Sequence, residues 1–203
     1  ASTVGSAANA ISESARDAAE RSQFGQSIAT FGAIKHKLGE MTLRTYAIES
    51  MVFRTAGLID GSIQTANSEV NTALLEALEE FAIESSILKV AGSETLDYVF
   101  DENVQIHGGN GYVRDYPAER HYRDSRVNRI FEGTNEINRL LIPSRLIKLS
   151  LTGQLPLIEI AEDLVEKIRT GELEIPRQEG PLEDQLVAVE LFKKVAIAIL
   201  GLA

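Results

Sequence analysis

The sequence has no cysteine, no tryptophan and few aromatic residues, which make up 6% of its 203 positions. Without cysteine the chain cannot form a disulfide framework, a thiolate nucleophile or a cysteine-ligated zinc site. Its chemistry must therefore come from oxygen groups, imidazoles or a bound cofactor. The scarcity of aromatic residues, in a chain rich in alanine, leucine, isoleucine and glutamate, favours helix over sheet.

Basic residues are also in the minority, and the formal net charge is -10. Binding to nucleic acid or to anionic lipid usually needs a clustered excess of lysine and arginine, so both are poor candidate partners. The longest apolar run, residues 195–203, is far shorter than the ~20 residues that cross a bilayer, and we expect no transmembrane segment. The expected location is the cytoplasm if the protein is bacterial and the mitochondrion if it is eukaryotic.

Apolar residues recur every three or four positions along several segments, which is the spacing of one helix face. The pattern predicts helices over residues 2–20 and 31–56, and a third, the longest, capped by Asn67 and Ser68. A fourth is predicted over residues 135–151, kinked at Pro143. The buried face of the third should hold Leu74, Leu78, Phe81, Ser85, Leu88, Thr95 and Val99. Four helices with short connections predict an all-α fold, an antiparallel four-helix bundle.

The last quarter of the chain differs from the rest. A short helix near residues 157–169, an acidic link marked by proline and glycine over residues 170–181, and a last amphipathic helix from about Leu182 are predicted. We therefore expect a bundle domain over residues 1–150 and the start of an additional C-terminal helical region over residues 151–203. Because helical patterns reach both ends, we expect a fragment of a longer protein.

Glu132 has an unusual position in the sequence. It follows an aromatic residue, precedes a glycine and lies two residues before a predicted helix start with Thr134 as N-cap, next to the positive end of a helix dipole. The simplest interpretation is an acidic residue that complements this dipole. A catalytic base would also need an apolar, water-poor neighbourhood, for which Tyr112, Ile130 and Phe131 are available.

Other patterns leave alternatives open. The glycines at Gly108, Gly109 and Gly111 indicate either a turn between helices or backbone amides that approach a phosphate or an adenine closely. Arginine recurs at every third position from Arg120 to Arg129 with acidic residues between, which favours ion pairs or a subunit contact over anion binding. The histidines lack metal-ligand spacing, so we expect them on the surface or in loops and expect no metal site.

Four segments together resemble the acyl-CoA dehydrogenases in residue type, order and interval. They are Arg21–Gly25, Gln105–Tyr112, Asp115–Asp124 and Arg129–Glu136. The resemblance covers roughly residues 1–150, and the continuation beyond it looks like the very-long-chain branch of the family. It implies the C-terminal helical domain of an FAD-dependent enzyme of fatty-acid β-oxidation.

The resemblance also implies roles for single residues. Glu132 matches the base that takes the α-proton of an acyl-CoA thioester while the β-hydrogen leaves as hydride to FAD, which yields a trans-2-enoyl-CoA. Gly133 would lie against the acyl-CoA. The residues implied to contact FAD are Arg21, Gln23, Phe24, Gln105, Gly108, Gly109, Thr134 and Glu136.

The implied partners are the acyl-CoA substrate, electron-transferring flavoprotein and further copies of the chain. The resemblance favours a dimer, with FAD at the subunit interface, and implies that the isolated fragment is inactive. Two alternatives stay open: a non-catalytic helical interaction or assembly module with the same fold, and an acyl-CoA oxidase whose reduced flavin reacts directly with oxygen.

Overall fold

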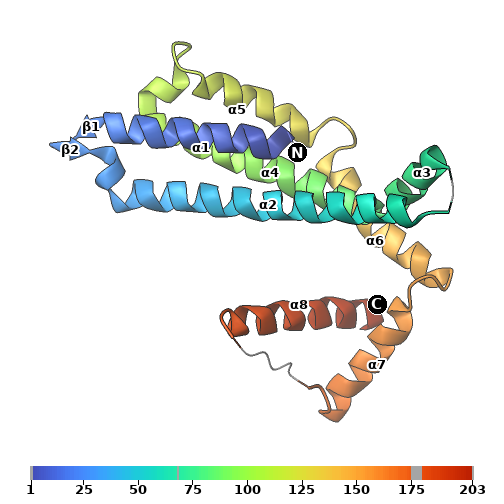
Figure 1. Ribbon diagram of the computed structural model, residues 1–203. Helices are drawn as coiled ribbons and strands as arrows, with labels where there is room; N and C mark the ends of the chain where they lie inside the picture. Colours follow the sequence, from blue (N-terminus) through green and yellow to red (C-terminus); the bar gives the residue numbers. More distant parts are fainter. Residues whose placement is uncertain (1, 68, 175–179, 203) are drawn as a thin grey trace. The chain divides into compact units, whose positions relative to one another are not determined.

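The structure is a computed structural model that describes residues 2–67, 69–174 and 180–202 (Figure 1). The described residues confirm the all-α prediction, because a two-residue strand pair is their only sheet. The helices are α1 (Ser2–Glu20), α2 (Gly32–Thr65), α3 (Val70–Glu80), α4 (Ala82–His107), α5 (Ala118–Arg126), α6 (Asn135–Leu151), α7 (Leu157–Thr170) and α8 (Glu183–Leu202). The shorter elements are β1 (Ser22–Gln23), β2 (Gln26–Ser27) and three 3₁₀ helices, η1 (Ile28–Thr30), η2 (Gly108–Tyr112) and η3 (Val127–Arg129).

The chain divides into two compact units, residues 1–142 and 143–203. The division falls inside α6, at Pro143, which lies within that helix. The boundary expected at residue 150, between a bundle domain and an additional C-terminal helical region, stays a prediction.

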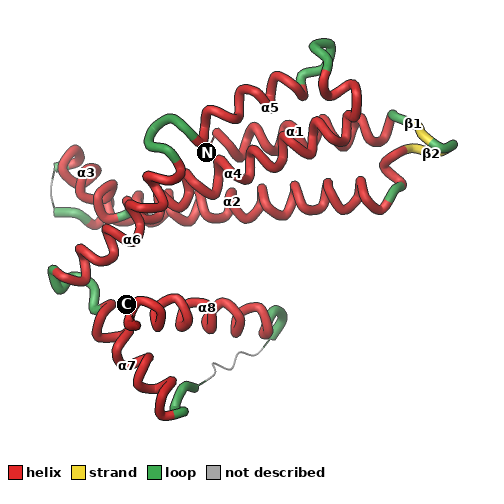
Figure 2. Tube along the Cα trace, turned by 180° about the vertical axis from the view of Figure 1, so that it is seen from behind, coloured by secondary structure: helices red, strands yellow, loops and turns green. Residues whose placement is uncertain are grey.

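The first unit is an antiparallel bundle. Helices α1, α2 and α4 lie side by side, and α5 packs on α4 (Figures 1 and 2). Helices α1 and α4 run in one direction, whereas α2 and α5 run in the other. The sequence predicted the helix over residues 135–151 as the fourth helix of the bundle, but the fourth helix is α5. Helix α6 instead meets α4 through polar side chains at its N-terminus, and its apolar Ile137 and Leu140 are exposed.

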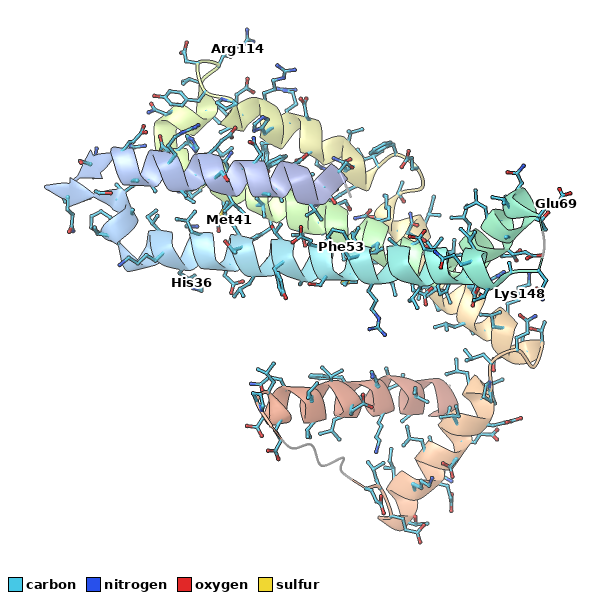
Figure 3. The ribbon with its side chains drawn as sticks, in the orientation of Figure 1. His36, Met41, Phe53, Glu69, Arg114 and Lys148 are labelled. Carbon is cyan, nitrogen blue, oxygen red and sulfur yellow. The ribbon has the colours of Figure 1, made fainter. Side chains whose placement is uncertain are left out.

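Small side chains dominate the packing of α1. Ala7, Ala10 and Ala18 are buried, which lets α1 approach α4 closely. In α2, Met41, Thr45 and Ile48 are buried at the spacing of three and four residues that predicted a helix here; Met41 is labelled in Figure 3. Full burial of the Met41 side chain contributes roughly 1.5–3 kcal/mol. The core is completed by Ile28, Leu96, Val99, Phe100 and Ile106.

The predicted third helix is in fact two helices. Phe81, with φ -93° and ψ 25°, separates α3 from α4, so α2 with its 34 residues is the longest helix. The predicted cap was also wrong at Asn67, because α3 begins after Glu69, which makes no side-chain cap hydrogen bond. Ser68 lies outside the described residues.

The break changes which side of the segment is buried. Leu74 and Leu78 were expected in the core but are exposed, whereas Ala73 and Ala77 are buried on the side of α3 that packs against α2. Short side chains suit this close approach of two helices joined by a short connection. Further along, Val99 is buried as predicted. Ser85 is exposed, and Leu88 and Thr95 are half-buried.

In the second unit, α7 and α8 pack against each other around Ala161, Leu164 and Ala198. Both helices confirm the sequence prediction, and α7 ends at Gly171, whose φ of +76° is the usual left-handed C-cap. Residues 175–179 of the predicted link lie outside the described residues. None of the helices that the structure describes is long and apolar enough to cross a membrane.

Candidate active site

The segment around Phe24 is a tight hairpin. Gln23 pairs with Gln26, and the two residues between them, Phe24 and Gly25, have φ values of +53° and +81°. Two-residue hairpin loops favour this left-handed backbone, but for phenylalanine it costs about 1–2 kcal/mol. The hairpin holds the Phe24 ring 91% exposed, edge-on to Phe31 at 6.3 Å between ring centroids. Gln23 is also exposed.

Arg21 joins this hairpin to the end of α4. Its Nη1 donates a hydrogen bond of 2.6 Å to the backbone oxygen of His107, 86 residues away. Gly108 follows with φ +58°, and a Cβ there would lie 3.0 Å from Nη1 of Arg21. The site therefore excludes a side chain at position 108. The structure brings together Arg21 and the segment Gln105–Gly109, and within that segment Gln105 and Gly109 are exposed.

The bond from Arg21 has a purely structural effect as well. A cation at the C-terminus of α4 stabilises the helix dipole and satisfies one of its terminal carbonyls. A guanidinium carries five N–H donors, however, and the bond to His107 uses one of them. An anion can thus bind Arg21 at the same time. His107 itself is buried and packs edge-on to Tyr116, so the expectation that it lies on the surface was wrong.

Glu132 lies in a second left-handed turn. Its φ is +54° and that of Gly133 is +80°, directly before α6. The hydroxyl of Thr134 accepts a hydrogen bond of 3.3 Å from the backbone N–H of Ile137, which confirms Thr134 as the predicted N-cap. A Cβ on Gly133 would lie 3.1 Å from Nδ2 of Asn138, so glycine suits both the backbone and the space.

Side chains from α4 and α6 fasten this turn. Lys89 donates 2.6 Å to the backbone oxygen of Gly133 and 2.8 Å to Oδ1 of Asn135. Nδ2 of Asn138 donates 3.0 Å to the same Gly133 oxygen. Asn135 is buried, and its Nδ2 donates to the hydroxyl of Ser93 at 3.0 Å and to the Glu94 carboxylate at 3.2 Å. None of these residues except Gly133 was expected at the site from the sequence, although Lys89 is noticeable as a lysine between the apolar Leu88 and Val90.

Two carboxylates near the turn, those of Glu94 and Glu136, have a pKa below the ordinary value. A hydrogen bond from Arg139 lowers the pKa of Glu94, and burial acts in the opposite direction. Hydrogen bonds from its own backbone N–H and from Thr134 lower the pKa of Glu136. A small pocket of about 130 Å³ brings the two together; it is lined by Glu94, Arg126, Arg129, Ile130, Thr134, Asn135 and Glu136.

Glu132 does not have the expected apolar shield in this chain. Its side chain is exposed, and the three residues expected to cover it, Tyr112, Ile130 and Phe131, are 85%, 54% and 44% exposed. Tyr112 instead lines a groove of about 690 Å³ along α4, η2 and α5, together with Asp101, Val104, Glu119, Tyr122, Arg123 and Arg126. The prediction of a water-poor site is thus wrong for these residues by themselves.

Two of the four arginines of the run form ion pairs, as the favoured interpretation predicts. Arg120 pairs with Asp124 at 3.6 Å, and Arg129 pairs with Asp97 of α4 at 3.0 Å. The second pair ties the segment before Glu132 to α4. At the rise of 1.5 Å per residue in a helix, Lys89 and His107 are roughly 27 Å apart along α4. The Arg21 cluster (residues 21–25 and 105–109) and the Glu132 cluster (residues 132–136 with Lys89) therefore lie at separate places along this helix.

The motifs and their geometry match known proteins. The family model for the C-terminal domain of acyl-CoA dehydrogenases matches residues 1–147. A protein of Bacillus subtilis (strain 168) named probable acyl-CoA dehydrogenase is 46% identical over 204 residues, which cover 99% of this chain and 34% of that protein. The chain belongs to the acyl-CoA dehydrogenase family.

Two further relatives extend the comparison. The crystal structure of an acyl-CoA dehydrogenase from Bacillus anthracis, complexed with FAD, superposes with a TM-score of 0.91 and 45% identity over 98% of this chain and 34% of that one. Subunit CarC of the caffeyl-CoA reductase-Etf complex of Acetobacterium woodii is 34% identical over 146 residues, 72% of this chain and 34% of the subunit. The acyl-CoA dehydrogenase family is FAD-dependent.

This chain spans about a third of the length of the acyl-CoA dehydrogenase relatives that it matches. The two Bacillus proteins match both of its units, whereas the family model ends near the C-terminus of α6. Glu132 is thus exposed in a segment that corresponds to about one third of such a protein.

Proposed function

We propose that the full-length protein is an acyl-CoA dehydrogenase in which Glu132 takes the α-proton of an acyl-CoA thioester. The observation that carries the proposal is the fastened turn, which holds Glu132 in a left-handed backbone directly before the α6 N-terminus. An α-proton beside a thioester is only weakly acidic, so a base must be aimed at it and held there. Backbone strain at a defined position is a common property of such sites.

FAD fits the residues of the Arg21 cluster. The guanidinium with free donors suits a phosphate, and Gly108 supplies a surface without a side chain beside it. The exposed Gln23, Phe24, Gln105 and Gly109 would hold the rest of that end of the cofactor. When bound, FAD supplies the acceptor that takes the β-hydrogen as hydride.

The Glu132 cluster would hold the reacting parts of FAD and of the acyl-CoA. Thr134 and Glu136 offer a hydroxyl and a carboxylate to hydrogen-bond donors of FAD, and Gly133 lets the acyl-CoA approach the backbone. Because the two clusters are roughly 27 Å apart along α4, we propose that they serve different FAD molecules in a homo-oligomer. The Gln105–Gly109 segment would then contact the FAD of a neighbouring subunit.

The proposal requires a cover for Glu132. The exposed Ile130 and Phe131 would become the apolar wall of a site only when the remaining two thirds of the protein, the substrate or both exclude water from it. We therefore propose that residues 1–150 form the FAD- and acyl-CoA-binding domain and that the isolated chain turns over no acyl-CoA.

Glu132→Gln in the full-length protein tests the proposal. Anaerobic flavin reduction by butyryl-, octanoyl- and palmitoyl-CoA should slow by about 10²–10⁴-fold, because a positioned general base contributes that much. Bound FAD, measured from the flavin absorbance, should not change. Wild-type reduction rates in the variant would contradict the role of Glu132, and the absence of reduction in the wild type with all three substrates would contradict the enzyme itself.

Electron-transferring flavoprotein is the proposed redox partner. The name of the Acetobacterium woodii relative places that subunit in a complex with Etf, and the same name favours a second candidate function, reduction of an enoyl-CoA. Mixing the reduced enzyme with an enoyl-CoA and with oxidised electron-transferring flavoprotein separates the two directions. Hydrogen peroxide release in air would instead indicate an oxidase. If Glu132→Gln left the biological role of the protein intact, the non-catalytic module would be favoured.

A further inference from the structure

Lys89 connects α4 to the turn that carries Glu132. Its ammonium donates to the Gly133 backbone oxygen at 2.6 Å and to Oδ1 of Asn135 at 2.8 Å. Both acceptors are neutral oxygens, so the charge of Lys89 is used on the backbone of the turn and on the amide that anchors α6.

Resting on the function proposed above, we propose that Lys89 is a positioning residue for Glu132. By holding the Gly133 carbonyl, it keeps Glu132 in the left-handed conformation from which its carboxylate meets the α-carbon of the acyl-CoA.

The backbone on both sides of Glu132 supports this role. Upstream, the N–H groups of Ile130 and Phe131 both donate to the oxygen of Val127, at 2.8 and 3.1 Å. Downstream, the oxygen of Gly133 is held by Lys89 from α4 and by Asn138 from α6. Phe131, Glu132 and Gly133 lie between these two anchored peptides, with Glu132 in the middle. The anchors on both sides help to hold Glu132 in a left-handed conformation, which is unfavourable for a residue with a Cβ.

Lys89 differs from the other anchors in where its support originates. Asn138 lies on α6, so it moves with that helix and fixes the turn only relative to it. Lys89 lies on α4, 44 residues away in sequence, and α4 packs against α1 and α2 in the bundle. Through Lys89, the base is thus positioned relative to the bundle and not only relative to α6. An error of about 1 Å in such a position can cost ~100-fold in rate.

The test uses the full-length flavoprotein and three variants. Lys89→Met removes the donors but keeps the length of the side chain, Lys89→Arg restores a donor that reaches two acceptors, and Lys148→Met is the matched control. Lys148, labelled in Figure 3, is an exposed lysine of the second unit for which the structure gives no side-chain hydrogen bond or ion pair. The measurements are FAD content, the rate constant of flavin reduction at saturating substrate, KM, and amide hydrogen exchange of residues 130–136.

Lys89→Met should slow flavin reduction by roughly 10–100-fold, with KM within about threefold and FAD content unchanged, and should accelerate exchange of residues 130–136. Lys89→Arg should recover most of the rate and of the protection. Lys148→Met should equal the wild type in every measurement.

Two results would overturn the role of Lys89. Normal reduction by Lys89→Met, with a wild type that is active, contradicts it while leaving the proposed function standing. Loss of FAD and of rate together, without rescue by Lys89→Arg, shows a structural residue only. A wild type that shows no flavin reduction would contradict the proposed function itself. The exchange measurement would still test whether Lys89 holds the turn, because it does not depend on activity.

Discussion

Two turns of this chain share a backbone conformation and differ in what fastens them. In each, a left-handed residue with a side chain, Phe24 or Glu132, precedes a left-handed glycine. The first turn is closed by the strands on either side of it, so its support lies within six residues. The second is fastened by Lys89 and Asn135, side chains that connect it to α4. The backbone pairing of the two strands sets the geometry of the hairpin, whereas the geometry of the Glu132 turn depends on bonds to the bundle.

The difference matches the roles proposed for the two places. A ring that stacks against a ligand, such as Phe24, tolerates small shifts of its hairpin because dispersion contacts are non-directional. A base that must meet one proton does not tolerate them. The four predictions below test this difference between the two turns, and the expected effects are given from the largest to the smallest.

Asn135→Ala should cause the largest loss. Asn135 is buried and bonds Lys89, Ser93 and Glu94 at once, so its removal leaves buried or half-buried partners unsatisfied. We expect the free energy of unfolding of the full-length protein to fall by roughly 2–3 kcal/mol, measured by urea titration. Asn9→Ala is the control, because Asn9 makes an exposed hydrogen bond to Glu13 within one helix and should change little.

This dependence on the bundle also explains what the sequence could and could not predict. The start of α6 was predictable because Thr134 acts within a few residues of the helix that it caps. Lys89 is noticeable locally as a lysine between two apolar residues, but that pattern does not identify Gly133, 44 residues away, as its acceptor. The break at Phe81 was missed because no glycine or proline marks it in the sequence.

The site residues divide in the same way. Motif resemblance located the Arg21 and Glu132 segments, and the structure added that Arg21 contacts the His107–Gly108 peptide bond region. Tyr112 does not cover Glu132 as expected, because it is the last residue of η2 and lines the groove along α4 and α5. A sequence pattern identifies which residue types are present but not which of two neighbouring surfaces a loop residue faces.

Gly133→Ala against Gly25→Ala compares the two turns directly. Both glycines have positive φ, which costs alanine about 1–2 kcal/mol. Only at position 133 does the new Cβ also meet a neighbour, Asn138 at 3.1 Å, and displace a bond to the turn. We expect about 2 kcal/mol of destabilisation and slower flavin reduction for Gly133→Ala, and about 1 kcal/mol with an unchanged reduction rate for Gly25→Ala. Equal effects on rate would show that the two turns are fastened equally well.

Phe24→Asn should change stability in the opposite direction. Asparagine followed by glycine is the preferred pair for a two-residue hairpin loop, and the Phe24 ring is 91% exposed, so little packing is lost. The variant should gain about 1 kcal/mol in the free energy of unfolding. Its FAD affinity, measured by titrating the apoprotein, should fall if the exposed ring contacts the cofactor. A variant that gained stability and kept its affinity would place the ring outside the FAD site.

Arg139→Met should have the smallest effect and should appear mainly in the dependence of stability on pH. The hydrogen bond from Arg139 holds the pKa of Glu94 below its ordinary value of 4.5. A carboxyl whose pKa is lower in the folded state stabilises the fold above pH 4.5, and this contribution is lost as the pH falls through the folded-state pKa. Both side chains are about half exposed, so solvent screens the pair. The wild type should therefore lose slightly more stability than Arg139→Met between pH 6 and acid pH, and identical pH profiles would show that the ion pair does not support the Asn135 anchor.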